Sequence, residues 1–218
     1  MTGAVNALEV TVTAPIASFR NPLYAAVQYG LPCPPPATVG GLLAGAAGGW
    51  DAVPPGTRFG MTFRSAAAGE DLETYHPLAA KGNKPDPKPV IRHFLVGVEL
   101  TLWLTDRIEW WAQVLRRPVW PMRLGRSQDL ATARTRVVTL TRGTGRQGTA
   151  LVPKDAASGG LELQLSTAVS LDRARTRWGA YRYHKDGWPR PVTTTDLVDP
   201  DGQAVVRLPP VHPSLMDS

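Results

Sequence analysis

The 218-residue sequence predicts an α+β fold in which one sheet, with two helices, is followed by a strand-rich C-terminal part. Three observations lead to this fold class. Strand-like alternation and helix-like spacing of apolar residues take turns along the first half of the chain. Glycine and proline contribute 21 residues each, which is typical of many loops and short strands. Hydrophobic residues make up 43% of the chain, enough to build a packed core.

The first elements are a strand and a helix. A strand is expected over residues 8–13, where apolar and polar residues alternate, and Pro15 is expected to end it. A helix is expected over residues 38–48, because apolar residues recur there at helical spacing. This helix contains three glycines, which lower helix propensity, so we expect another part of the backbone or a ligand to approach it closely. These glycines are Gly40, Gly41 and Gly45.

The next elements complete a recognisable order. Residues 58–63 predict a second strand and residues 93–104 a third, separated by a polar insertion over about 66–92 that is expected to form a loop or hairpin. A short amphipathic helix follows over residues 108–115, with Asp106 as the expected N-cap. With one more strand, the order strand, helix, strand, strand, helix makes a ferredoxin-like sheet with an insertion between its middle strands.

The remainder of the chain is predicted to be mostly β. Further strands are expected at residues 136–141, 161–167 and 178–184. The tail from Val198 is rich in proline and is expected to be irregular. We therefore divide the chain into a ferredoxin-like domain at residues 1–125 and a β-rich C-terminal region at residues 126–218.

Positive charge is concentrated in one stretch of the sequence. Residues 110–150 contain eight arginines and one acid, Asp129, and so carry a net charge of +7. The rest of the chain has 16 basic and 17 acidic residues, a net charge of −1. This asymmetry favours a polyanionic partner, of which nucleic acid is the commonest. The alternative interpretation is a solvated basic face, and with it a basic β-rich interaction module.

Several function classes are disfavoured. Cys33 is the only cysteine, so no intrachain disulfide can form, and no signal peptide is visible. The most apolar segment, residues 37–50, is too short to span a bilayer, so we expect a cytoplasmic protein without a membrane partner. The four histidines are not paired at helical spacing, and we expect neither a metal nor a cofactor. The G-x-G-x-x-G match at residues 143–148 is not followed by a helix and is interpreted as a basic hairpin tip.

One group of residues could support RNA cleavage. Arg92 and His93, together with a tyrosine such as Tyr24 or Tyr29, could cut RNA through the 2′-hydroxyl without a metal. The alternative is that His93 is an ordinary residue at the start of a strand, and we favour this alternative.

Two segments resemble the sequence signatures of a known family. Residues 17–22 (ASFRNP), 31–36 (LPCPPP) and 37–43 (ATVGGLL) resemble the N-terminal signature of the CRISPR-associated Cas-five family, part of the RAMP superfamily. Residues 120–126 (WPMRLGR) resemble the second landmark of that family. The resemblance covers residues 8 to about 130, and the C-terminal 90 residues resemble the family only in being rich in strands.

The resemblance implies a structure and a function. The expected structure is an RRM-like RAMP domain with a thumb formed by residues 66–92. The expected function is that of the Cascade subunit that caps the 5′ handle of the CRISPR RNA (crRNA) in a type I system. The expected partners are this crRNA, the backbone and large subunits, and target DNA through the complex.

The resemblance and the residues together give a set of RNA contacts. The first landmark implies contacts near the loop after the first strand, and the second implies contacts that face either RNA or protein. The contacts implied by the first landmark are Phe19, Arg20 and Thr38. Those implied by the second landmark are Arg123 and Arg126. The N-terminus of the first helix could present unpaired N–H groups to a phosphate. The basic residues of the insertion are candidates for holding the RNA backbone: Lys81, Lys84, Lys88 and Arg92.

A subgroup of the family also cuts precursor crRNA, using tyrosine, lysine and histidine. In this sequence the comparable dipeptide is Arg92-His93, and no lysine accompanies it. Arginine is a poorer proton donor than lysine, since its pKa exceeds about 12. We therefore expect a binding subunit without catalytic residues, and keep a metal-independent endoribonuclease on the same fold as the alternative.

Overall fold

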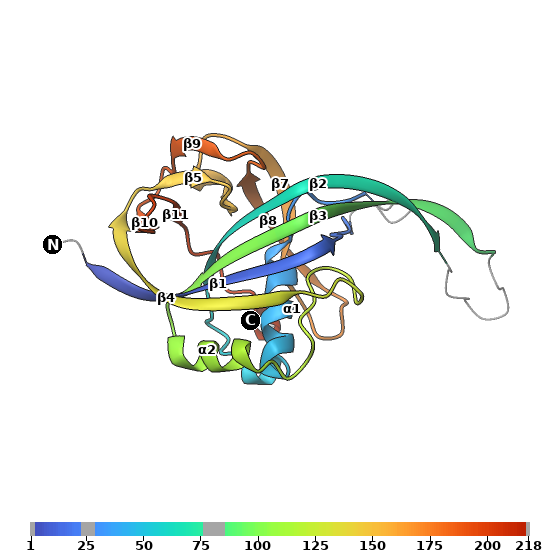
Figure 1. Ribbon diagram of the computed structural model, residues 1–218, viewed down its shortest axis with the longest axis horizontal. Coiled ribbons are helices and arrows are strands. Elements are labelled where there is room, and N and C mark those ends of the chain that lie inside the picture. Colours follow the sequence, from blue (N-terminus) through green and yellow to red (C-terminus); the bar gives the residue numbers. More distant parts are fainter. Residues whose placement is uncertain (1–2, 23–28, 76–85, 217–218) are drawn as a thin grey trace.

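The computed structural model describes residues 3–22, 29–75 and 86–216 (Figure 1). Its main sheet is antiparallel and runs in the order β11-β10-β4-β1-β3-β2. In chain order, its first strands and α-helices are β1 (Ala4–Ala17), α1 (Pro36–Ala47), β2 (Phe59–Tyr75), β3 (Lys88–Leu104), α2 (Ile108–Arg116) and β4 (Thr132–Gly143). Within the described residues, no helix is both long enough and apolar enough to cross a membrane.

The C-terminal part consists of short strands. Those beyond the main sheet form a three-stranded sheet, β6-β8-β7, and a two-stranded sheet, β5-β9. The strands that follow β4 in the chain, of which β10 and β11 belong to the main sheet, are β5 (Arg146–Gly148), β6 (Val152–Pro153), β7 (Leu161–Val169), β8 (Thr176–Tyr183), β9 (Trp188–Pro191), β10 (Asp196–Val198) and β11 (Ala204–Val205). The described residues also form three single-turn helices: η1 (Trp50–Ala52), η2 (Lys154–Ala156) and η3 (Pro213–Met216).

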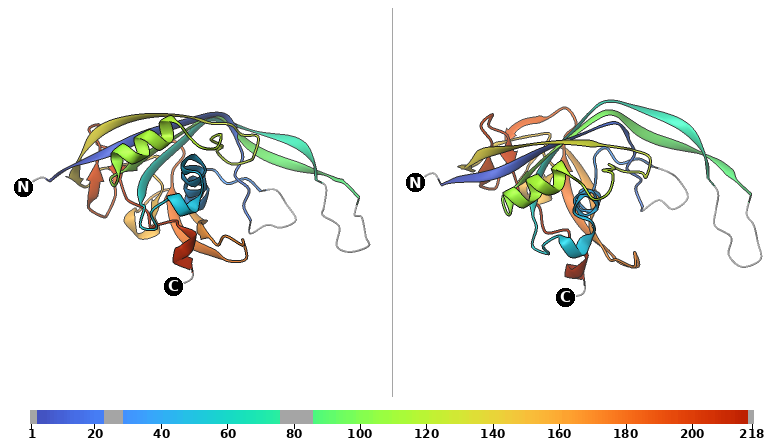
Figure 2. Two further views of the ribbon diagram at one scale, coloured as in Figure 1. Left: turned by 90° about the horizontal axis from the view of Figure 1, so that it is seen from below. Right: turned by 60° about the horizontal axis from the view of Figure 1, so that its bottom comes forward.

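The main hydrophobic core lies between one face of the main sheet and the elements that cover that face. The alternate residues Leu8 and Val10 of β1 point into this core, where they join Trp111 of α2 and Tyr181 of β8. Figure 2 shows that both helices lie on the same side of the sheet. Because the intervening residues of β1 point to the other side, Glu9 lies on the face without helices.

The α+β class, with a dominant antiparallel sheet and two helices, is confirmed. The helix expected over residues 38–48 is α1, and the strands expected in the C-terminal part are β4, β7 and β8. The chain on both sides of residue 125 shares one core, since β4 pairs with β1 and Tyr183 packs with Phe63.

Three local predictions are wrong. Pro15 does not end the first strand, which continues to Ala17. Asp106 does not cap α2, because the N-cap is Arg107, which has a left-handed conformation and makes no side-chain cap. The tail from Val198 is not wholly irregular: it contributes β11 and continues through the core, where Leu208 is fully buried.

The predicted insertion begins as a continuation of the two middle strands. β2 and β3 stay paired as far as Tyr75 and Lys88 and reach beyond the rest of the sheet (Figure 1). We call residues 66–75 and 88–96 the arm. At its base lies Gly97, whose φ of +58° is unfavourable for other residues, and the pairing skips this residue between Val98 and Val96. The remaining part of the insertion, residues 76–85, lies outside the described residues.

Candidate nucleic-acid interface

The two sequence landmarks meet in space at the end of β1. The backbone N–H of Ser18 donates to Oδ2 of Asp129, 3.1 Å away, and the Ser18 hydroxyl donates to the carbonyl oxygen of His93 at 2.7 Å. The backbone N–H of Arg126 donates to the same Asp129 oxygen at 2.9 Å. We call Ser18, His93, Arg126 and Asp129 the landmark junction. It joins the first landmark, the second landmark and the arm.

The conformation of the second landmark follows from this junction. Gly125 has φ of +107°, and a Cβ atom added to it would lie 2.7 Å from the carbonyl oxygen of Ser18. Leu124 before it is fully buried, whereas the guanidinium of Arg126 pairs with Glu73 of the arm. The Leu-Gly-Arg sequence therefore anchors a loop against β1 and the arm.

The first landmark places its two expected contacts differently. The side chain of Phe19 is only 3% exposed and meets the ring of Phe63 edge-on at 5.7 Å, so it belongs to the core and is not available for stacking on a base. Arg20 is exposed and forms an isolated bridge with Gly30. Arg20 lies on the surface, and its contact with RNA stays a prediction, whereas the burial of Phe19 in the core corrects the expectation that it faces RNA.

The N-terminus of α1 does not form the expected phosphate cradle. The N–H groups of Thr38 and Val39 both donate to the carbonyl oxygen of Pro35, at 2.9 and 3.2 Å, and Pro36 has no N–H. Thr38 itself is half-buried. At Gly40, an added Cβ atom would lie 2.5 Å from the side chain of Val211, so the close approach is made by the C-terminal segment rather than by a ligand.

The four basic residues of the predicted insertion that are candidates for RNA contact differ in what the structure shows of them. Lys81 and Lys84 lie outside the described residues, and Lys88 is exposed at the start of β3. Arg92 pairs with Asp71 directly across the two strands, with its Nε donating to Oδ1 at 2.7 Å. This hydrogen bond lowers the pKa of the Asp71 carboxyl and raises the pKa of Arg92. Arg92 is thus committed to a partner within the arm.

His93 lies beside one of its two candidate tyrosines. The rings of His93 and Tyr29 have centroids 5.5 Å apart and an angle of 44° between their planes, and Nδ1 of His93 is 3.3 Å from Oε1 of Glu70. Both rings line a cavity of about 310 Å³. Tyr24, the other candidate, lies outside the described residues.

The basic segment 110–150 does not form one continuous stripe. Arg116 ends α2 on the helical side, whereas Arg136 of β4 lies opposite Glu9 on the face without helices. Part of the charge is also compensated, since Arg136 donates to Glu9 at 2.6 Å and Arg126 pairs with Glu73. Arg123 is exposed and forms a bridge with Leu130.

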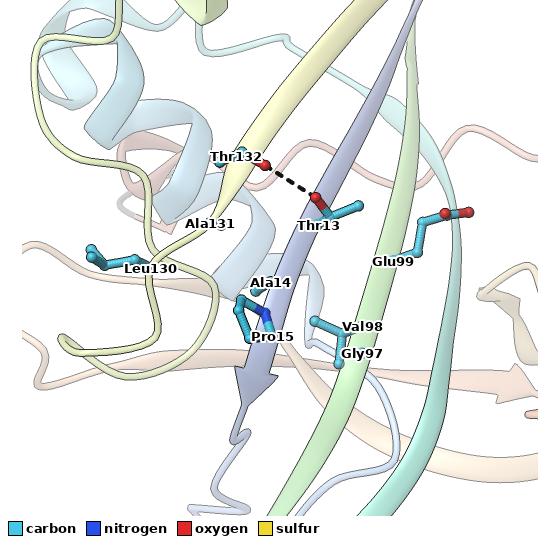
Figure 3. Close-up of a pocket in the computed structure, with 9 residues that line it drawn as sticks. All are labelled: Thr13, Ala14, Pro15, Gly97, Val98, Glu99, Leu130, Ala131 and Thr132. Atoms are coloured by element: carbon cyan, nitrogen blue, oxygen red, sulfur yellow. Dashed lines mark hydrogen bonds between the residues drawn. The ribbon is translucent and has the colours of Figure 1, made fainter.

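A groove of about 610 Å³ lies at the base of the arm (Figure 3). It is bordered by Pro15, Gly97 and Leu130, and the hydroxyls of Thr13 and Thr132 lie within hydrogen-bond distance of each other, 3.0 Å apart, in its wall. Its lining is largely apolar, so this groove is poorly suited to a phosphate backbone.

Sequence reasoning missed the acidic members of the site. Asp129, Asp71 and Glu73 each hold a backbone group or a guanidinium that positions the arm or the landmark loop. A signal existed for Asp129, which is the single acid in the basic segment. Among the described residues, no three His, Cys, Asp or Glu side chains gather closely enough to hold a metal ion.

Comparison with known proteins gives a family for this arrangement. No curated protein matches the chain. A chain of a solved structure described as a CRISPR RNA-guided surveillance complex matches with a TM-score of 0.56 and 16% identity, over 85% of this chain and 91% of that chain. A CRISPR protein from Archaeoglobus fulgidus matches with a TM-score of 0.52 and 12% identity, over 94% of this chain and 99% of that chain. Both share the fold, and residues 7–187 match the model of the family described as CRISPR-associated protein (Cas_Cas5), so the chain belongs to that family.

Proposed function

We propose that this chain is a non-cutting, RNA-binding subunit of a type I CRISPR surveillance complex (Cascade). In this proposal it holds the repeat-derived 5′ handle of crRNA in the cytoplasm, contacts the backbone and large subunits, and meets target DNA only through the complex. Family membership supports a CRISPR role, and a chain of a CRISPR RNA-guided surveillance complex has the same fold.

The arrangement of the sheet supports the finer fold assignment. The elements run β1-α1-β2-β3-α2-β4, and the strands lie in the order β4-β1-β3-β2 with antiparallel neighbours. This arrangement is consistent with a ferredoxin-like domain of the RRM and RAMP type. In this interpretation the arm is the base of the thumb.

The landmark junction is the observation that carries the RNA-binding proposal. Exposed Arg20 follows Ser18 by two residues, and exposed Arg123 pairs with Leu130, next to Asp129. Because Ser18 and Asp129 are hydrogen-bonded, two cations that are far apart in sequence are carried by joined segments. Arginine side chains presented in this way suit bidentate contacts to a phosphate backbone.

The test is the salt dependence of binding to repeat-derived RNA, measured by fluorescence anisotropy. The logarithm of the affinity should fall steeply between about 50 and 200 mM salt. Arg20→Ala and Arg123→Ala should each weaken binding and reduce the salt slope by about 1. The matched control is Arg116→Ala, an exposed arginine at the end of α2, which should have little effect. Affinity that stays flat with salt would contradict the proposal and favour a basic β-rich interaction module.

The proximity of His93 and Tyr29 favours a second candidate, a metal-independent endoribonuclease that processes precursor crRNA. The two rings and the Glu70 carboxylate could share proton transfers at a 2′-hydroxyl. Against it stands Arg92, whose pairing with Asp71 raises a pKa that is already too high for a proton donor. Incubation with repeat RNA in EDTA distinguishes the candidates, because only the endoribonuclease yields a discrete cut.

A further inference from the structure

A second cavity, of about 450 Å³, lies between the turn that connects β8 to β9 and the start of β7. We call it the Trp188 pocket. Trp188 and His184 form an aromatic wall, with ring centroids 5.6 Å apart and planes inclined by 33°. Tyr183 is also part of the lining, and its hydroxyl already donates to the carbonyl oxygen of Phe63 at 3.0 Å. The pocket is therefore a preformed, largely apolar site of the size that small ligands occupy.

Two polar atoms of the aromatic wall have no hydrogen-bond partner within the described residues. They are Nε1 of Trp188 and Nδ1 of His184, and both are buried. An unsatisfied buried polar group costs roughly as much as a lost hydrogen bond, so each such group calls for an explanation. The indole N–H can only donate. The Nε1 edge of Trp188 lies against Gly159 and is closed to the pocket, so the indole can offer a ligand its ring face rather than its N–H.

The Trp188 pocket adjoins the cavity that holds His93 and Tyr29. Pro32 and Leu161 line both cavities, so a chain lying over one passes directly to the other. Lys185 and Asp186 lie at the rim of the Trp188 pocket. The ammonium of Lys185 can hold a phosphate, and the carboxylate of Asp186 can accept from the amino group of a base.

We infer that the Trp188 pocket holds one unpaired nucleobase of the RNA strand that this chain binds. This inference rests on the proposed RNA-binding function and adds a site built mainly by the C-terminal part of the chain, to which the first landmark contributes Pro32. Stacking on aromatic side chains tolerates any base, so the ring faces of Trp188 and His184 can hold a base without reading its identity.

The test is an abasic scan of repeat-derived RNA, with affinity measured for the full chain and its variants. For the wild-type chain, removal of the base at one position should weaken binding by about 5- to 100-fold. In Trp188→Leu this position-specific loss should disappear. Trp178→Leu is the matched control, since Trp178 is an exposed tryptophan of the neighbouring β8, and the loss should remain.

Milder variants keep the test decisive if Trp188→Leu does not fold. Trp188→Phe keeps an aromatic wall with a smaller ring face, and His184→Ala removes one ring, so each should reduce the abasic loss. An identical abasic profile in the wild type and in the folded variants overturns the inference while RNA binding itself persists. Failure of the wild-type chain to bind the RNA overturns the proposed function as well. Saturable binding of free nucleoside monophosphates that depends on Trp188, with no abasic effect, would assign the pocket to a free nucleotide and overturn the RNA assignment.

Discussion

Ser18 and Asp129 are 111 residues apart in sequence, yet the backbone N–H of Ser18 donates to the buried carboxylate of Asp129 at 3.1 Å. The same carboxylate accepts from the N–H of Arg126. One acid therefore fixes the loop of the second landmark against the end of β1. The segments that carry Arg20 and Arg123 depend on this contact for their relative position.

Removal of this carboxylate should destabilise the fold. Asp129→Ala leaves two N–H groups without their acceptor, and each unsatisfied group costs about 1–3 kcal/mol, so the free energy of unfolding should fall by about 2–6 kcal/mol. The measurement is urea unfolding. Asp51→Ala, at an exposed position, is the control and should change the free energy by less than about 0.5 kcal/mol. Equal stability of the two variants would show that the junction contributes little.

Two adjacent glycines of α1 should respond in opposite ways to the same substitution. Gly41 is exposed with open space around its Cα, so Gly41→Ala should stabilise the protein by about 0.5–1 kcal/mol. At Gly40 the new methyl group would lie 2.5 Å from Val211, and Gly40→Ala should lower the thermal midpoint. Thermal unfolding of both variants checks the pair. A stabilised Gly40→Ala would mean that the C-terminal segment does not pack against α1.

The periodicity of the sequence predicts the framework but not the strand ends. β1 continues past Pro15 because β4 pairs with it only as far as Thr13, and because Pro15 lies opposite the irregularity at Gly97. A missing N–H at that position removes no regular hydrogen bond of the sheet. Such tolerance depends on the partner strand and is not visible in the local sequence.

The candidate site was predictable as a region and not residue by residue. The two landmarks identify loops that are joined in the structure. The local sequence does not show that Phe19 packs against Phe63, or that Arg126 pairs with Glu73, a residue 53 positions away in sequence. The polar character of the arm suggests a loop. Cross-strand pairs such as Asp71 with Arg92 instead let polar residues form a long hairpin.

The pairing of Arg92 with Asp71 should make the stability of the fold depend on pH at acidic pH values. The hydrogen bond lowers the pKa of Asp71 in the folded state, so its stabilising contribution is complete above the unfolded pKa of 3.8 and is lost as the pH falls through the folded pKa. Arg92→Gln should return the pKa of Asp71 towards its ordinary value, as measured by carboxyl NMR titration. Arg117→Gln, at an exposed site, should leave that titration unchanged. If the pKa of Asp71 is the same in Arg92→Gln as in the wild-type chain, Arg92 is not held by Asp71 and is available for another role.

The outer arm should be dispensable for folding. Among the described residues of the outer arm, Leu72 and Ile91 form a cross-strand pair and are 76% and 53% exposed. Replacing residues 72–91 with a short Gly–Ser turn therefore removes little apolar surface that is buried in the described part of the chain. The shortened chain should still unfold cooperatively in calorimetry, with a midpoint lowered by the loss of Glu73, because that loss leaves the partly buried guanidinium of Arg126 without its partner.

The same shortened chain should fail to assemble with the backbone subunit on guide RNA, as followed by size-exclusion chromatography. The untruncated chain is the control. Normal assembly without the outer arm would show that it is only a surface hairpin.

The central claim is that this chain binds RNA without cutting it. The most direct test compares Arg20→Ala and His93→Ala with the wild-type chain, using repeat RNA in EDTA. Affinity and RNA length are measured in the same samples. The wild-type chain should bind intact RNA, Arg20→Ala should weaken binding by about ten- to a hundredfold, and His93→Ala should leave both affinity and length unchanged. A discrete cut by the wild-type chain that His93→Ala abolishes, with affinity retained, would contradict the account and identify an endoribonuclease.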